Sequence, residues 1–173
     1  MEESFRGEYY QRVDSKARML IPAPFRRILD RGDERTAESP RTRIVIVYGG
    51  GRARSFCEIY TMERAELLAA KVRRMKPGSE ERKKAELHLL KRSVPVDIDD
   101  DGRIVMPPQV REKLGIDADA MKDGVEAVLA GVGNRLELWR GDLYREAHPL
   151  ISDDEDEDEA DPLSYLPDDD QEF

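Results

Sequence analysis

The chain has 173 residues, of which 39% are hydrophobic and 39% are charged, enough for one modest core beneath a heavily charged surface. A single cysteine, Cys57, excludes an internal disulfide framework and favours a reducing compartment, and the sequence predicts neither a signal peptide nor a membrane-spanning run. We therefore expect a cytoplasmic protein, and the formal net charge of −9, taken alone, argues against a nucleic-acid partner.

The first part of the chain alternates short apolar runs with polar turns. A strand is predicted from Tyr9 to Val13, and the apolar run Met19–Ile21 after a tight turn predicts a second. A helix follows, from about Pro24 to Leu29, because proline fits the first turn of a helix, where its missing N–H costs nothing. After a polar loop, apolar runs on either side of a glycine turn predict a hairpin with strands at 43–48 and 56–60.

A helical pair comes next. Thr61 and Ser79 each precede acidic residues and a helical pattern, so each is predicted to cap a helix through its hydroxyl oxygen. The first helix ends at Pro77-Gly78, and the second runs to about Lys91. This pair has no match in the second half of the chain.

The remaining elements repeat the first part. A strand around Pro95 leads into an acidic turn, and a helix is predicted from about Pro108 to Leu114. Two further strands are predicted at 125–129 and 136–139, followed by a short helix at 142–147.

An internal repeat with an offset of 85 positions organises the chain. The matched pairs are Asp14 with Asp99, Arg18 with Arg103, and Pro22 with Pro107. Two copies are too few for a solenoid, and a half of roughly 80 residues buries too little surface to fold alone. We therefore expect one pseudo-symmetric domain in which each half completes the core of the other.

The motif that carries the repeat resembles the MraZ family. It consists of Asp-x-x-x-Arg, a short apolar run, proline, and then Phe-Arg or Val-Arg, and the runs Phe5–Tyr9 and Gly131–Trp139 are also similar to that family. The resemblance implies tandem AbrB-like (SpoVT-AbrB) domains in a ring-forming, DNA-binding transcriptional regulator of the cell-division and cell-wall gene cluster. The chain departs from the family pattern at Ala17, where glycine is usual, in its acidic second turn, and in its acidic tail.

Residues and resemblance together predict an α+β, β-rich fold in four parts. They are a first AbrB-like half at 5–60, a helical pair at 61–92, a second AbrB-like half at 93–147, and a disordered acidic tail at 152–173. The halves, of the swapped-hairpin type, are expected to interleave into one domain.

The first turn gathers three cations, Arg12, Lys16 and Arg18, around Asp14. Aspartate at this position is expected to fix the turn by accepting backbone N–H groups. A rigid row of cations suits phosphates, and arginine can also form a fork on the guanine edge. A solvated charged turn is the simpler alternative. With the repeat and the resemblance, we assign the three cations to DNA binding and Asp14 to turn support.

The second turn carries one cation, Arg103, among carboxylates at positions 97, 99, 100 and 101. Because carboxylates repel a phosphate backbone, we expect Arg103 to pair locally and to contribute less to DNA binding than the first turn. Asp99 and Gly102 are expected to shape this turn. The aspartate spacing resembles the start of a calcium loop, but the later glutamate is missing, so we expect no metal.

No catalytic constellation emerges from the sequence. The glycine run at 49–51 lacks the Gly-Lys-Ser/Thr ending of a P-loop, and Cys57 lies in a strand pattern as a buried thiol. His88 and His148 are isolated from each other and from any nucleophile. We therefore expect neither an enzyme nor a cofactor.

The charge is divided unevenly along the chain. Residues 1–92 carry 22 basic and 14 acidic side chains, residues 93–151 carry 7 and 12, and residues 152–173 carry 12 acidic and no basic ones. Because residues 1–92 are basic, one face of the protein is expected to bind nucleic acid despite the negative net charge of the whole chain. The sequence does not identify a partner for the acidic tail.

Two functions from different classes follow. The leading one is a nucleoid-associated, sequence-specific transcriptional repressor that binds direct repeats in promoter double-stranded DNA as a homo-oligomeric ring. The alternative is a ring-forming scaffold whose acidic parts bind protein partners, with weak or no DNA binding.

Overall fold

A computed structural model describes residues 3–150 and 161–168 and shows a mixed α/β fold with antiparallel strands, as predicted. The strands are β1 (Phe5–Val13), β2 (Arg18–Leu20), β3 (Arg43–Val47), β4 (Cys57–Thr61), β5 (Ser93–Asp97), β6 (Arg103–Val105), β7 (Val125–Gly133) and β8 (Leu136–Arg140). The helices are α1 (Ala23–Arg31), α2 (Met62–Arg73), α3 (Glu80–Ala85), the π-helix η1 (Glu86–Lys91), α4 (Pro108–Leu114), α5 (Ala118–Lys122), α6 (Gly141–Ala147) and the 3₁₀-helix η2 (Pro162–Tyr165).

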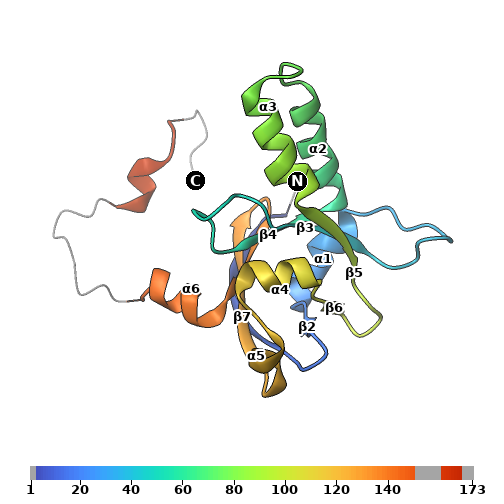
Figure 1. The fold of residues 1–173 in the computed structure, drawn as a ribbon, viewed down its shortest axis with the longest axis vertical. Coiled ribbons are helices and arrows are strands. Elements are labelled where there is room, and N and C mark those ends of the chain that lie inside the picture. The colour runs from blue at the N-terminus through green and yellow to red at the C-terminus, as the bar shows by residue number, and fades with distance from the viewer. Residues whose placement is uncertain (1–2, 151–160, 169–173) are drawn as a thin grey trace.

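The strands pair across the two repeats. Six of them form one sheet in the order β1-β7-β8-β4-β3-β5, and β2 and β6 form a separate two-stranded ribbon (Figure 1). At one edge, β1 of the first repeat pairs with the β7-β8 hairpin of the second repeat. At the other edge, β5 of the second repeat pairs with the β3-β4 hairpin of the first repeat. The hairpins meet where β4 pairs with β8. Neither repeat contains the partner of its own first strand.

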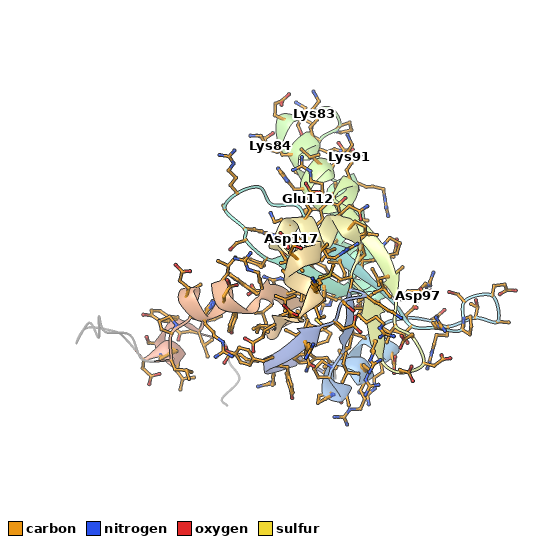
Figure 2. The ribbon with its side chains drawn as sticks, turned by 60° about the horizontal axis from the view of Figure 1, so that its bottom comes forward. Lys83, Lys84, Lys91, Asp97, Glu112 and Asp117 are labelled. Atoms are coloured by element: carbon orange, nitrogen blue, oxygen red, sulfur yellow. The ribbon has the colours of Figure 1, made fainter. Side chains whose placement is uncertain are left out.

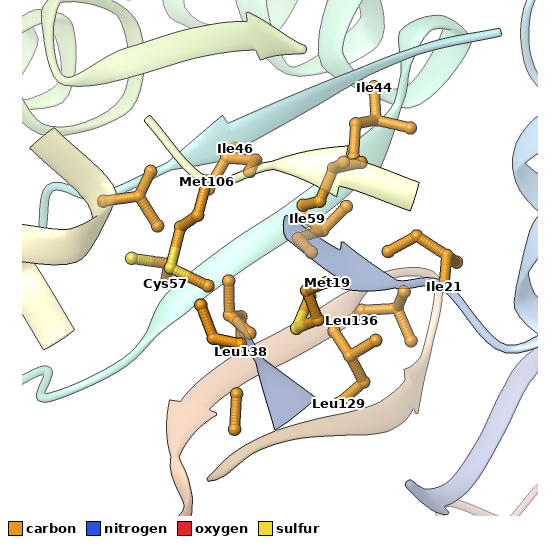
Figure 3. Packing of buried hydrophobic residues seen from close by; sticks show 14 of the residues in the cluster. Met19, Ile21, Ile44, Ile46, Cys57, Ile59, Met106, Leu129, Leu136 and Leu138 are labelled. Carbon is orange, nitrogen blue, oxygen red and sulfur yellow. The ribbon is translucent and has the colours of Figure 1, made fainter. Parts of the chain in front are cut away.

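The core lies between the sheet and the β2-β6 ribbon (Figure 3). Met19 of β2 lies opposite Ile104 of β6, and both side chains are fully buried. From the sheet, Ile44, Ile59 and Leu129 pack into the same cluster. The apolar residue in the middle of each ribbon strand therefore ties the ribbon to the sheet, through burial that stabilises the protein in proportion to the apolar area removed from water.

A second apolar cluster lies outside this core, where α6 packs on β7 and β8. Trp139 stacks on Phe56 with ring centroids 4.7 Å apart and meets Tyr144 edge to face at 5.7 Å. The Tyr144 hydroxyl donates a hydrogen bond to Glu8, which links α6 to β1. This cluster fixes α6 on the sheet.

The central strand pair contains a buried carboxylate. Glu58 of β4 is 3% exposed and lies opposite Glu137 of β8. Glu58 is paired with both Arg54 and Arg135, while Glu137 accepts a hydrogen bond from the indole N–H of Trp139 at 3.0 Å. A buried charge is tolerated only when it is paired, so the two arginines allow this carboxylate in the middle of the sheet.

The helices α2, α3 and η1 form an arm that rises from the sheet (Figure 1). Thr61 and Ser79 accept the backbone N–H groups of Arg64 and Arg82 at 3.1 and 3.2 Å, so both predicted caps are confirmed. The second helix does run to Lys91, but its last turns are π-helical. His88 in this π-helix accepts the Gly50 N–H at 3.1 Å through Nδ1, which gives a predicted isolated histidine a structural partner.

Several boundaries differ from the prediction for physical reasons. Strand β1 begins at Phe5 and β7 extends to Gly133 because these strands pair along nine residues, which neither local pattern reveals. Helix α5 is too short to show periodicity, and Asp117 caps it by accepting the Ala120 N–H at 2.8 Å. Helix α4 has the predicted bounds, and Gly115 ends it in the left-handed conformation.

The predicted acidic tail at 152–173 lies largely outside the described residues. Its described part, residues 161–168, contains η2 and is exposed throughout. None of the helices in the described ranges is both long and apolar enough to cross a bilayer.

Replacing either buried residue of the ribbon is expected to destabilise the whole fold. Met19→Ala or Ile104→Ala leaves a cavity in the core and should lower the free energy of unfolding by about 2–5 kcal/mol. Urea denaturation followed by circular dichroism measures this loss. The matched control is Val105→Ala, because Val105 neighbours Ile104 but is 57% exposed. A comparable loss in the control would contradict the assigned ribbon orientation.

Candidate nucleic-acid interface

Asp14 organises the first turn. One of its carboxylate oxygens accepts the backbone N–H groups of Lys16 and Arg18 at 3.0 and 2.9 Å, and the other accepts Nε of Arg18 at 2.8 Å. The Arg18 N–H has the largest part in holding the pKa of Asp14 below its usual range, and the Arg18 side chain and the Lys16 N–H add to it. The ionised Asp14 therefore fixes both the turn and the direction of the Arg18 side chain.

The second turn repeats this hydrogen-bond pattern. Asp99 accepts the backbone N–H groups of Asp101 and Arg103, each at 2.9 Å, and the Arg103 N–H is the main cause that lowers the pKa of Asp99. The Gly102 N–H donates to the Asp99 carbonyl at 3.0 Å, as the Ala17 N–H does to the Asp14 carbonyl at 2.9 Å. The two turns thus have one geometry.

The residue before each arginine adopts a left-handed conformation. Gly102 has a φ of 78°, and Ala17, with a φ of 61°, is the one non-glycine residue with positive φ in the described part of the chain. Such a conformation costs a non-glycine residue about 1–2 kcal/mol. At Gly102 a Cβ would meet the end of the flexible Arg26 side chain, which would have to shift to make room for it.

The ribbon joins the two turns and presents one exposed face. In its register Arg18 lies opposite Val105 and Leu20 lies opposite Arg103. Side chains directly opposite each other point to the same side of a sheet, so these four share the face away from the buried Met19. Arg18 and Arg103 therefore lie diagonally across the ribbon from each other, and the aliphatic Leu20 and Val105 occupy the other diagonal.

The predicted DNA-binding cations do not all lie in one row. Arg18 and Arg103 share the ribbon face, and Lys16 is exposed at the tip of the first turn. Arg12 extends from β1 and donates a hydrogen bond to the Asp123 carbonyl at 3.1 Å. The guanidinium of Arg12 thus also holds the segment that leads into β7.

The acidity of the second turn is offset by a segment that sequence reasoning treated only as a surface loop. Arg41 lies 3.7 Å from Asp100, and Arg26 and Arg35 line the same small pocket of about 230 Å³ beside the turn. Within the described ranges the Arg103 side chain forms no direct ion pair, but its charge, together with that of Arg41, helps to lower the pKa of Asp99. Arg41 approaches from the loop before β3 and adds positive charge beside the acidic turn.

Two arginines at matching positions of the repeat were given no role in the sequence prediction. Arg26 of α1 and Arg111 of α4 are 85 positions apart, and each has a buried Nε without a hydrogen-bond partner in the described structure. Arg26 packs its guanidinium against Gly102. The signal was present in the Phe-Arg and Val-Arg endings of the repeat, which fix these arginines one helical turn into their helices.

Charge is distributed over well-separated parts of the molecule. Figure 2 shows Lys83 and Lys84 near the end of the helical arm and Asp97 at the end of β5, far from them. Part of the basic charge of residues 1–92 therefore lies on the arm, far from the acidic end of β5.

Two observations bear on metal binding and on the reactivity of the cysteine. The described residues contain no group of three or more His, Cys, Asp or Glu placed to hold a metal ion. Burial raises the pKa of the Cys57 thiol to about 12, so this cysteine is protonated at neutral pH and is a poor nucleophile.

Comparison with known proteins gives a consistent result. Residues 89–161 match the family described as "MraZ protein, putative antitoxin-like". The chain is 44% identical to a transcriptional regulator MraZ of Cereibacter sphaeroides over 144 residues, which cover 83% of this chain and 84% of the relative. It is 36% identical to a transcriptional regulator MraZ of Ruegeria pomeroyi over 169 residues, 96% of each chain. A transcriptional regulator MraZ of Azotobacter vinelandii is 29% identical over 140 residues, 81% of this chain and 82% of that one.

The two turn aspartates should make the fold sensitive to acid. Their pKa values are lower in the folded protein than in the unfolded chain, so the stabilisation they give is complete above the unfolded value of about 3.9 and is lost as the pH falls through the folded values. Thermal melts from pH 7 to pH 3 should therefore show a smaller decrease in Asp14→Asn and Asp99→Asn than in the unmodified protein. Equal pH slopes in all three proteins would contradict the role of these carboxylates.

Proposed function

Because the chain belongs to the MraZ family, as its 44% and 36% identity to MraZ regulators over most of its length shows, we propose that it is a sequence-specific DNA-binding regulator of transcription. The regulated genes are those that the family resemblance implies, the cell-division and cell-wall cluster, and the mode of regulation is repression. The protein acts at promoter DNA in the nucleoid, without a catalytic step.

The single observation that carries DNA binding is the β2-β6 ribbon with its two outward-facing arginines. The major groove of B-DNA is about 12 Å wide and admits a two-stranded β-ribbon. Arg18 and Arg103 stand on the exposed face of this ribbon, and the arginine fork matches the O6 and N7 acceptors of guanine. Nε of Arg18 donates a hydrogen bond to the Asp14 carboxylate, which orients this guanidinium before DNA arrives.

Cations around the ribbon supply contacts to the phosphate backbone. Lys16 extends from the first turn, and Arg12 lies near the end of β1, before that turn. Such contacts position the protein on the duplex without reading its sequence, and they make the affinity depend on salt. The first turn dominates because Asp100 and its neighbours weaken the field of Arg103, although Arg41 partly offsets them.

The same repeat that builds the ribbon gives it approximate two-fold symmetry. The matching turns, the diagonal placement of like residues and the exchange of first strands between hairpins support two pseudo-symmetric halves of the swapped-hairpin type. An approximately two-fold protein face suits an approximately palindromic element within each DNA half-site.

We propose further that copies of the chain assemble into a ring. The sheet has two edges, β1 and β5, and Pro95 in the middle of β5 removes one backbone donor from that edge. Strand β1 is longer and contains no proline, so it is the edge that is open to another chain. A ring presents several ribbons to direct repeats at once, and avidity then exceeds the affinity of one ribbon.

Loss of one ribbon arginine should weaken DNA binding without unfolding the protein. Arg18→Ala should cost about 1–3 kcal/mol per subunit, while Arg103→Ala should cost less because of its acidic neighbours. Fluorescence anisotropy with the DNA upstream of the protein's own gene measures both, and Arg73→Ala on the helical arm is the control. Equal losses for Arg18 and Arg103 would contradict the asymmetric assignment. Failure of the unmodified protein to bind this DNA would favour the scaffold alternative.

Assembly is tested separately. Multi-angle light scattering at micromolar concentration should give a mass that is a multiple of the 19.8 kDa chain. A monomer mass would refute the ring, and it would leave DNA binding by one ribbon as a separate question.

A further inference from the structure

The exposed face of the ribbon contains two aliphatic side chains that the proposed function does not explain. Leu20 is 41% exposed and Val105 is 57% exposed, although the strands that carry them bury their middle residues completely. Because these side chains are exposed, their burial contributes little to the stability of the core. A polar residue at either position would serve a solvated ribbon as well.

Their placement gives them a common partner. Leu20 lies opposite Arg103 and Val105 lies opposite Arg18, so each aliphatic side chain stands beside a guanidinium on the same face. If the arginines approach base edges in the major groove, the aliphatic side chains approach the same edges. The one apolar group that a base presents there is the C5-methyl group of thymine.

We infer that Leu20 and Val105 contact thymine methyl groups and so select thymine next to the bases contacted by Arg18 and Arg103. This inference rests on DNA binding by the ribbon. The flanking cations argue against an apolar protein surface as the occupant, because a protein partner would have to desolvate two guanidinium groups to cover the pair.

The register also sets the spacing of the recognised thymines. Diagonal neighbours in an antiparallel pair lie about 7–8 Å apart. Successive bases along one strand of DNA rise about 3.4 Å. The two side chains are therefore placed for thymines about two base steps apart.

Removing the methyl groups from the DNA tests this contact directly. The unmodified full-length chain is titrated with its own upstream DNA, once with thymine and once with deoxyuridine at every thymine position. Burial of one methyl group corresponds to about a fourfold change in affinity, so the uridine duplex should bind at least fourfold more weakly. Leu20→Ala and Val105→Ala should each bind the thymine duplex more weakly and show a smaller ratio between the two duplexes.

The chain offers matched controls for both variants. Leu67 is 52% exposed on α2 and Val132 is 39% exposed on β7, away from the ribbon. Leu67→Ala and Val132→Ala should keep both the affinity and the thymine-to-uridine ratio of the unmodified protein. Because uridine also alters DNA shape, the change in this ratio between variants, and not the ratio itself, isolates the contact.

Each outcome is decisive. Equal binding of the two duplexes by the unmodified chain, or an unchanged ratio in Leu20→Ala and Val105→Ala, refutes the thymine contact while DNA binding stands. A changed assembly mass in these variants with an unchanged ratio identifies the pair as a protein interface instead. Absence of binding to either duplex by the unmodified chain refutes the proposed function itself.

Discussion

The contact of Met19 with Ile104 beneath the ribbon is the interaction on which the rest of the structure depends. These residues come from different repeats, so their burial holds β2 against β6 and the ribbon against the sheet at once. The exposed face of the ribbon exists only as the reverse side of this buried pair. A site that needs two halves of one chain cannot form in either half alone, and its geometry is as rigid as the core behind it.

Charged side chains distinguish the two ends of the ribbon. Backbone N–H groups of the turns lower the pKa values of Asp14 and Asp99, and Glu58, within the sheet, is paired with Arg54 and Arg135. The second turn differs from the first because Arg41 must compensate its additional carboxylates. The turns at the two ends of the ribbon therefore have the same backbone geometry but different electrostatic fields. In the proposed complex this gives an approximately symmetric protein a preferred direction on DNA.

Sequence reasoning predicted the elements well where chemistry is local. Proline at helix starts, the hydroxyl caps of Thr61 and Ser79, and the glycine that ends α4 gave the helices their correct places. It failed where partners are distant in the chain. The length of β1 depends on β7, the partner of His88 in the π-helix is the distant Gly50, and Arg41 reaches the second turn only after folding. The candidate site was found through the repeat, but the shared face of Arg18 and Val105 required the register.

The exchange of first strands has a consequence for how the chain is made. Strand β1 is synthesised well before its partner β7. Phe5 cannot pair with Gly133 until β7 has left the ribosome. Contacts of such wide sequence separation slow folding, because a large loop must close before they form. Until then the long β1 edge has no partner within its own chain. An unpaired strand edge of this kind is a template for pairing with other chains, so an incompletely synthesised chain is expected to be prone to association.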